Sequence, residues 1–419
     1  MTKDKIKFKV YTLGCKVNQY DSSWLRGCLS DNGFKLVKNN ADLAVINTCA
    51  VTKVAIRKSK QTINKAKKEN PQAKIILIGC WPKTYEINEH ELNIEAVLKD
   101  KKMEEIIKKV KKICNQNENK LTTQQDFLAT NDRARYFIKI QDGCEQFCSY
   151  CIIPLARGKI TSRPADEVIK EMERVVKKGF KEFVLTGIHL GLYGKDCRSA
   201  NLVELLHRII ELPGLGRVRL SSIEINEVNN DLIELIAENK KLCKHLHIPL
   251  QSGCDKILKL MNRPYDTSFF EEKVKKIRSA MPDIALTTDV IVGFPGENQN
   301  DFNTTYNFVK EMNFSRLHVF PFSAHERTKA YTMPDKVDIK EIKKRTESLR
   351  LLSGVLEHNF KKGFYNKTEK VLIESKIGNG YRGKTEHYFD VEFNDKQLVN
   401  EKDKEVLKVK NIVEVKIQI

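Results

Sequence analysis

Three cysteines with the spacing C-x3-C-x2-C constrain the fold of this 419-residue chain more than any other feature. Cys144, Cys148 and Cys151 lie in GCEQFCSYC, directly after a strand-like segment at 136–140. Three thiols this close cannot share one face of a regular helix or strand, so they indicate a loop around a compact inorganic group. Thiolates select iron–sulfur clusters or zinc. No fourth Cys or His follows in the loop, which favours a [4Fe-4S] cluster with one open iron; zinc and free thiols are the alternatives.

Three more cysteines each follow a strand-like segment in the first third of the chain. The patterns at 7–14, 41–48 and 73–79 end at Cys15, Cys49 and Cys80, and a helical pattern covers 52–69. This alternation predicts a small parallel sheet with helices on its faces. Since the carboxyl ends of parallel strands meet at one edge, the three cysteines could share a site there. Taken singly, each would be interpreted as a buried thiol.

A second alternating block predicts a barrel. The candidate strands are 136–140, 183–187, 217–222, 245–250, 286–293 and 315–320. Helical patterns separate them, for example over 166–178, and a further helix is predicted over 337–362. Six such units predict a partial parallel (β/α)6 barrel, whose sites are built from the loops after the strands.

The predicted fold is therefore α/β, in three parts. We expect an N-terminal cluster domain over 1–113, a polar linker over 114–132 and a barrel with its trailing helix over 133–362. Strand patterns at 371–375, 388–393 and 412–417 predict a small all-β domain over 363–419.

Composition narrows the functional classes. The formal net charge is +19, and residues 1–120 hold 25 basic against 13 acidic side chains. Such a surplus suggests a polyanion such as nucleic acid, although Lys-rich solvated helix faces give the same composition. No apolar run approaches the ~18–20 residues of a membrane span, and the start of the chain lacks the apolar core of a signal peptide. We therefore expect a cytoplasmic protein whose 11 cysteines serve as ligands or ordinary thiols rather than disulfides.

The loop spacing after the first barrel strand resembles that of the radical S-adenosylmethionine superfamily. Together with Cys15, Cys49 and Cys80 and the domain order, it is similar to the methylthiotransferase family over almost the whole chain. The C-terminal segment GYRGKTEHYFDVEF resembles a TRAM domain through Gly383, Thr385 and Tyr388. The segments LGCKVNQYDS (13–22), NTCAVTKVAIRKSKQ (47–61) and IQDGCEQFCSYCIIPLARGKITSR (140–163) resemble the branch that acts on N6-threonylcarbamoyladenosine at tRNA position 37.

This resemblance implies two [4Fe-4S] clusters, one on each cysteine trio, and S-adenosylmethionine as cofactors. It implies the insertion of a methylthio group at adenine C2 in the anticodon stem-loop, with electrons from a donor of unknown identity. We expect a monomer. The alternatives are the same chemistry on isopentenyladenosine-37 or on an aspartate of a ribosomal protein. A different class of alternative is a non-catalytic iron–sulfur protein that binds RNA.

Polar residues in the loops after the strands are the candidates for binding S-adenosylmethionine. They are Gly187, His189, Ser222, Glu224, Gln251, Ser252, Arg157 and Arg163. Candidate RNA contacts are Tyr388, Phe389 and a lysine cluster on a predicted helix, comprising Lys101, Lys102, Lys108, Lys109, Lys111 and Lys112. The loop 321–330 departs from the family pattern Arg-x-Gly-Thr at His325 and Arg327, so we assign no site residue there.

Overall fold

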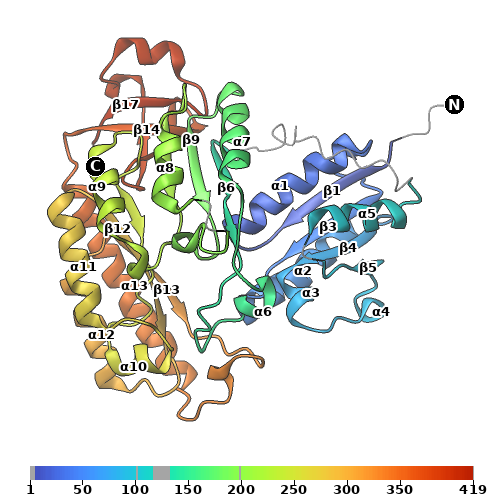
Figure 1. The fold of residues 1–419 in the computed structure, drawn as a ribbon, viewed down its shortest axis with the longest axis horizontal. Helices are drawn as coiled ribbons and strands as arrows, with labels where there is room; N and C mark the ends of the chain where they lie inside the picture. The colour runs from blue at the N-terminus through green and yellow to red at the C-terminus, as the bar shows by residue number, and fades with distance from the viewer. Residues whose placement is uncertain (1–4, 101, 117–132, 198–199, 419) are drawn as a thin grey trace.

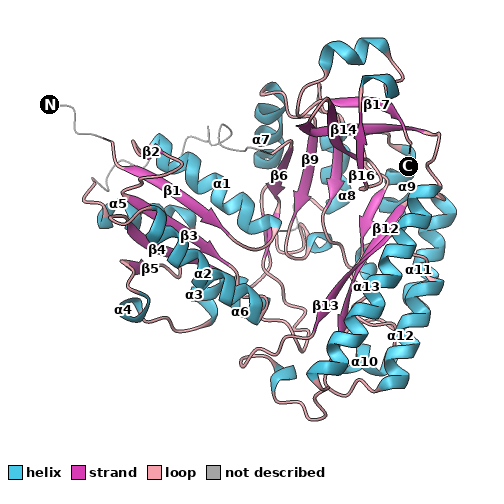
Figure 2. Cartoon of the chain, turned by 180° about the vertical axis from the view of Figure 1, so that it is seen from behind, coloured by secondary structure: helices cyan, strands magenta, loops and turns pink. Residues whose placement is uncertain are grey.

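The fold is that of a computed structural model, which describes residues 5–100, 102–116, 133–197 and 200–418. It contains an N-terminal α/β domain, a half-open barrel and a C-terminal antiparallel sheet (Figure 1, Figure 2). The predicted linker lies mostly outside the described residues. Within the described parts, no helix is both long enough and apolar enough to cross a bilayer.

The N-terminal domain is a five-stranded parallel sheet, as the alternating pattern predicts. Its order is β2-β1-β3-β4-β5. The strands are β1 (Lys7–Thr12), β2 (Lys35–Leu36), β3 (Leu43–Thr48), β4 (Lys74–Gly79) and β5 (Ala96–Val97). The helices are α1 (Lys16–Asp31), α2 (Lys53–Glu69), α3 (Cys80–Thr84), α4 (Glu89–Leu92) and α5 (Met103–Ile113). Buried apolar residues cover both faces of the sheet, which explains why its central strands are continuous apolar runs.

The wall of the barrel consists of two three-stranded parallel sheets, ordered β10-β9-β6 and β11-β12-β13. The strands are β6 (Arg135–Lys139), β9 (Glu182–Thr186), β10 (Arg217–Leu220), β11 (His245–His247), β12 (Ala285–Val292) and β13 (Arg316–Pro321). They pair in chain order, and isolated bridges join β10 to the segment of β11. The outer helices are α7 (Ala165–Lys177), α8 (Leu202–Ile210), α9 (Asn230–Glu238), α10 (Asp255–Leu260), α11 (Thr267–Ala280), α12 (Gln299–Glu311) and α13 (Ile339–Lys362). All six predicted strands are confirmed within a few residues.

Alternation along these strands separates an apolar outer face from a polar lumen. Tyr136, Ile138 and Leu185 pack with the outer helices in one core, so the residues between them face inward. Many of these inward residues are charged. The N-terminal domain spans the open side of the barrel, because α1 packs against β6 and the segment after β13 contacts α2 and α3.

The C-terminal domain is a four-stranded antiparallel sheet, ordered β16-β15-β14-β17. Its strands are β14 (Thr368–Ile377), β15 (Gly380–Thr385), β16 (Asp390–Phe393) and β17 (Ile412–Lys416). The sequence analysis did not predict β15, which contains Gly380 and Gly383. The sheet covers the end of the barrel at which the strands begin (Figure 1). There Arg135, the first residue of β6, forms an ion pair with Glu374 of β14 at 2.9 Å.

Candidate active site

The early cysteine trio lies at one edge of the N-terminal sheet. Cys15, Cys49 and Cys80 follow β1, β3 and β4, three neighbouring parallel strands whose carboxyl ends point toward the barrel (Figure 1). Gly79 precedes Cys80 with φ +99°, and a β-carbon there would collide with the backbone of Thr48. The glycine therefore allows β4 to turn sharply into α3 and brings Cys80 beside the other two cysteines.

Hydrogen bonds hold the loops of this trio in place. The amide of Asn18 donates to the carbonyl oxygens of Leu13 and Thr48, at 2.8 and 2.9 Å, and so ties together the loops before Cys15 and Cys49. Burial raises the pKa of Cys49 to about 11, and the thiols of Cys80 and Cys15 add to this rise. The three sulfurs thus form one electrostatic group.

The second trio occupies the loop after β6. Cys144, Cys148 and Cys151 lie between the strand and the short helix α6 (Ile153–Arg157). Burial raises the pKa of Cys151 to about 12, and the neighbouring thiols of Cys148 and Cys144 contribute. This trio is therefore also a single group of interacting sulfurs, on the loop that the sequence predicts.

Two side-chain pairs contact two of the three sulfurs of the barrel trio. The Sγ of Cys144 lies 3.5 Å from Nδ1 of His189, whose Nε2 forms an ion pair with Glu227 at 3.1 Å. Burial would lower the pKa of His189, but the contacts with Cys144 and Glu227 outweigh it and raise the pKa to about 10.

On the other side of the loop, Arg263 donates to the Sγ of Cys148 at 3.2 Å and also to Glu224. The sequence analysis did not single out Arg263. It lies just after α10, whose last residue, Leu260, accepts a hydrogen bond from Ser149 of the cysteine loop at 2.8 Å. The Arg263–Glu224 pair connects the loops after β10 and β11 to the cysteine loop, so it fixes the orientation of Cys148.

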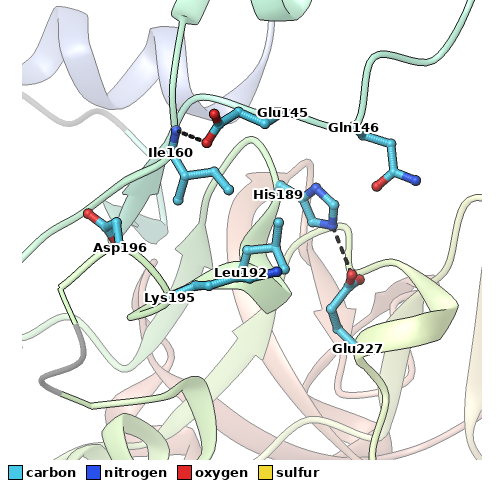
Figure 3. Close-up of a pocket in the computed structure, with 8 residues that line it drawn as sticks. All are labelled: Glu145, Gln146, Ile160, His189, Leu192, Lys195, Asp196 and Glu227. Atoms are coloured by element: carbon cyan, nitrogen blue, oxygen red, sulfur yellow. Dashed lines mark hydrogen bonds and ion pairs between the residues drawn. The ribbon is translucent and has the colours of Figure 1, made fainter.

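A pocket of about 370 Å³ opens beside the cysteine loop (Figure 3). His189 and Glu227 form one side of it, and the neighbouring Glu145 and Gln146 belong to the cysteine loop itself. Six of its eight lining residues are polar or charged, and one of them, His189, contacts the Sγ of Cys144, so the pocket offers partners to a ligand with polar groups.

The spacing of the sulfurs distinguishes between metal groups. A single zinc ion, with Zn–S bonds of about 2.3 Å, holds its sulfurs within about 4 Å of one another. Among the described residues, the groups with all ligand atoms within 4.8 Å are His247–Asp289–His318 and Glu369–Glu386–His387, and neither cysteine trio is among them. Neither trio therefore has the compact arrangement of a formed zinc site.

Arg157 connects the two trios electrostatically. It ends α6, six residues after Cys151, and its guanidinium donates to Asp21 at 2.9 Å, to Asp142 at 3.0 Å and to Asn18. Its positive charge also interacts with the thiols of Cys80 and Cys15. Asn18 Oδ1 in turn lies 4.0 Å from the Sγ of Cys80, so the helix that follows the barrel trio meets the loops of the early trio, and both trios face the same region.

Comparisons with known proteins agree with this geometry. Residues 138–309 match the Radical SAM superfamily, and residues 7–100 match the uncharacterized protein family UPF0004. A threonylcarbamoyladenosine tRNA methylthiotransferase of Bacillus subtilis is 37% identical over 402 residues, covering 91% of this chain and 89% of the relative. The chain belongs to the radical SAM methylthiotransferases.

Two further similarities concern the branch of the family and the fold. A tRNA-2-methylthio-N(6)-dimethylallyladenosine synthase of Thermodesulfovibrio yellowstonii is 34% identical, covering 90% of each chain. Among solved structures, the radical S-adenosylmethionine methyltransferase TsrM of Kitasatospora setae matches with a TM-score of 0.58 at 14% identity. That match covers 78% of this methylthiotransferase and 77% of TsrM, and it supports the fold alone.

The loop 321–330, which departs from the family pattern, joins the two halves of the methylthiotransferase. His325 accepts from the Tyr85 hydroxyl at 3.0 Å through Nδ1, and its Nε2 donates to the carbonyl of Val51 at 2.8 Å. Arg327 donates to the carbonyl of Thr84 at 2.8 Å. These contacts hold the segments after Cys49 and Cys80 against the end of β13.

The remaining candidate cofactor residues lie in the loops where they were expected, but several are occupied by protein contacts. Ser252 is fully buried, and its hydroxyl bonds Thr305 of α12 at 3.1 Å. Gln251 has φ +68°, and its backbone pairs with β12. Arg163 forms an ion pair with Glu171 at 2.8 Å. Ser222 bridges to the segment of β11, and Gly187 lies against Gln141.

Two predicted RNA contacts are wrong. Phe389 is buried in the core of the C-terminal sheet, so its ring cannot stack on a base. Lys111 is buried against Asn32. Lys102, Lys108 and Lys109 are exposed as expected, and Lys101 lies outside the described residues.

Proposed function

We propose that this enzyme inserts a methylthio group at C2 of N6-threonylcarbamoyladenosine-37 in tRNA. The observation that carries the proposal is the hydrogen bond of Arg157, just after the barrel cysteine loop, with Asn18, whose Oδ1 lies 4.0 Å from the Sγ of Cys80 in the other trio. Two thiolate trios that face one region are what sulfur insertion by two clusters needs. The name of the 37% identical relative supports the substrate.

The residues divide into two ligand sets. Cys144, Cys148 and Cys151 would hold one [4Fe-4S] cluster beside the pocket that would take S-adenosylmethionine. Cys15, Cys49 and Cys80 would hold the second. When bound, these cofactors would supply the radical chemistry that replaces the C2 hydrogen by a methylthio group.

The reaction requires a cofactor, because acidic and basic side chains could not remove the C2 hydrogen. The C2 hydrogen of adenine is not acidic near neutral pH, so no His, Asp or Glu could serve as its base. The side chains of the protein therefore bind the cofactors and orient the groups that react. Arg263 and His189 position two of the barrel cysteines, and the Arg157–Asp21 pair fixes the cluster domain relative to the barrel loop.

The domain division and the partners follow from this function. We retain the predicted boundaries: a cluster domain over 1–113, a linker over 114–132, the barrel over 133–362 and a TRAM-like module over 363–419. The substrate is the anticodon stem-loop of a tRNA, met in the cytoplasm by a monomeric enzyme. A separate reductant supplies electrons. The exposed lysines of α5 are suitable for contacts with phosphates.

Cysteine substitutions test the separate roles of the two trios. After anaerobic reconstitution the wild type should bind ~8 iron atoms per chain, and Cys49→Ala about half. Cys144→Ala should abolish S-adenosylmethionine cleavage, whereas Cys49→Ala should retain cleavage and lose sulfur insertion. Cys197→Ala, at an exposed thiol outside both trios, is the matched control. Equal loss of cleavage in the two trio variants would contradict separate roles.

Mass spectrometry of tRNA nucleosides tests the substrate. Cells that lack the gene should lose the methylthio form of threonylcarbamoyladenosine, and the gene should restore it. Loss of the methylthio form of isopentenyladenosine instead would assign the enzyme to the branch of the 34% identical relative. No change in either nucleoside, with no other gene supplying them, would contradict both assignments.

A further inference from the structure

Lys16 lies where the cluster domain meets the barrel lumen. It directly follows Cys15 and opens α1. Its charge interacts with Tyr388 of the C-terminal domain and with Arg135 and Arg219 of the barrel. It also acts on His245 of β11, on which the Tyr388 ring stacks with a centroid separation of 4.4 Å. Lys16 therefore connects a proposed cluster ligand with the inner wall of the barrel.

The other cations around Lys16 have carboxylate partners. Arg219 is 3.0 Å from Glu182, Arg135 is 2.9 Å from Glu374, and Lys384 is 2.6 Å from Asp390. Within the part of the chain that the structure describes, no ion pair or hydrogen bond engages the ammonium group of Lys16. The N–H donors of this half-buried ammonium group are therefore available to a ligand, and they lie next to the early cysteine trio.

The surroundings have a positive potential. Burial would raise the pKa of Tyr388, but the charges of Lys16, Arg135 and Lys384 outweigh it and hold the pKa below its ordinary value. A positive, partly desolvated environment favours an anionic ligand group over a neutral one of the same shape. A carboxylate on the ligand would give Lys16 the partner that the neighbouring cations already have.

We propose that Lys16 binds the carboxylate of the threonylcarbamoyl group and thereby selects the substrate. This inference rests on the proposed function and assigns its specificity to one residue. The carboxylate is attached through a short planar urea to N6, on the same edge of adenine as C2. A residue adjacent to a ligand of the sulfur-supplying trio is therefore within reach of the carboxylate when C2 faces that trio.

The alternative substrate would make no use of this cation. A dimethylallyl group on N6 is apolar, and it would leave the ammonium group of Lys16 desolvated and unpaired. Lys16 would then discriminate in two ways, by attracting the acid and by penalising the hydrocarbon.

A pair of RNA ligands tests the role of Lys16. One is an anticodon stem-loop that carries N6-threonylcarbamoyladenosine, and the other is the same RNA with the threonine carboxylate converted to the carboxamide. The reconstituted wild type should bind the acid at least tenfold more tightly, as a charge-assisted hydrogen bond predicts. Lys16→Gln should bind the two RNAs alike, and Lys16→Arg should restore part of the preference.

Control measurements separate this result from damage to the cluster. Lys276→Gln, at an exposed lysine on α11, should keep the wild-type preference. Lys16→Gln should retain its iron content and its S-adenosylmethionine cleavage without RNA.

Two outcomes would overturn the role of Lys16. One is a wild type that binds both RNAs equally, and the other is a Lys16→Gln variant that still prefers the acid. Failure of the wild type to methylthiolate the acid RNA would instead overturn the proposed substrate.

Discussion

Glu182 is the residue whose neutralisation should loosen the C-terminal domain. It lies fully buried at the start of β9 and accepts from Arg217 at 2.6 Å and from Arg219 at 3.0 Å. These arginines also donate to backbone carbonyls of the C-terminal domain, those of Lys370, Lys384, Thr385 and Glu386. A single carboxylate therefore pairs with both of the arginines that connect the barrel to this domain.

The magnitude follows from the pKa of Glu182. Burial would raise it, but Arg217 and Arg219 outweigh burial and lower it from 4.5 to about 2. At about 1.4 kcal/mol per pKa unit, the ionised carboxylate contributes about 3 kcal/mol at neutral pH. The general cost of breaking a buried ion pair is about 3–5 kcal/mol, in agreement. Since the folded-state pKa is depressed, the contribution is complete above pH 4.5 and is lost as the pH falls through about 2.

Proteolysis under native conditions measures this loss. When opening and closing are fast relative to cleavage, the rate follows the population of the open form, so Glu182→Gln should release the C-terminal domain about 100-fold faster at pH 7. Glu401→Gln removes an exposed charge and should leave the rate unchanged. An unchanged rate in Glu182→Gln would refute the reasoning, as would a difference from wild type that grows rather than shrinks below pH 4.5.

Two other substitutions test the placement of the cluster domain. Gly79→Ala should displace the third ligand of the early trio and lower the iron content from about eight to about four atoms per chain, with S-adenosylmethionine cleavage retained. Gly33→Ala, at φ +89° with open space around it, should keep all the iron; equal iron loss in both would point to general instability. Arg157→Met should destabilise the domain junction by about 2–3 kcal/mol in denaturant unfolding, because Asp21 and Asp142 lose one of their two cations and keep only Lys139. Arg208→Met, at an exposed ion pair, should cost less than about 1 kcal/mol, and a similar cost for both would contradict a structural role for Arg157.

Local patterns predict the parts of the fold that depend on neighbouring residues. The strands that end at Cys15, Cys49 and Cys80 are apolar runs bounded by turn residues, and the sheet follows from their alternation with helices. The convergence of the three cysteines is then a consequence of parallel topology. The two-residue strands β2 and β5 carry too little pattern to be recognised.

The contacts that the sequence analysis missed join residues far apart in the chain. Arg263 reaches Cys148 across 115 positions, and His325 reaches Val51 across 274. No periodicity connects such residues, and a single Arg or His in a loop does not indicate its partner. The same limit explains the error at Phe389, since an aromatic residue in a strand pattern suits an exposed stacking face or a core equally well.

The positions of Lys16 and Tyr388 indicate a role for the C-terminal domain inside the barrel. Tyr388 has φ +71° and reaches the lumen, where its ring stacks on His245 under the charges of Arg219 and Lys384. The domain thereby closes the end of the lumen opposite the barrel cysteines. If that closure positions Lys16, then loosening the domain through Glu182 should weaken the preference for the acid RNA while leaving iron content intact. The ion pairs of the domain junction and the selection of the substrate would then be linked through one tyrosine.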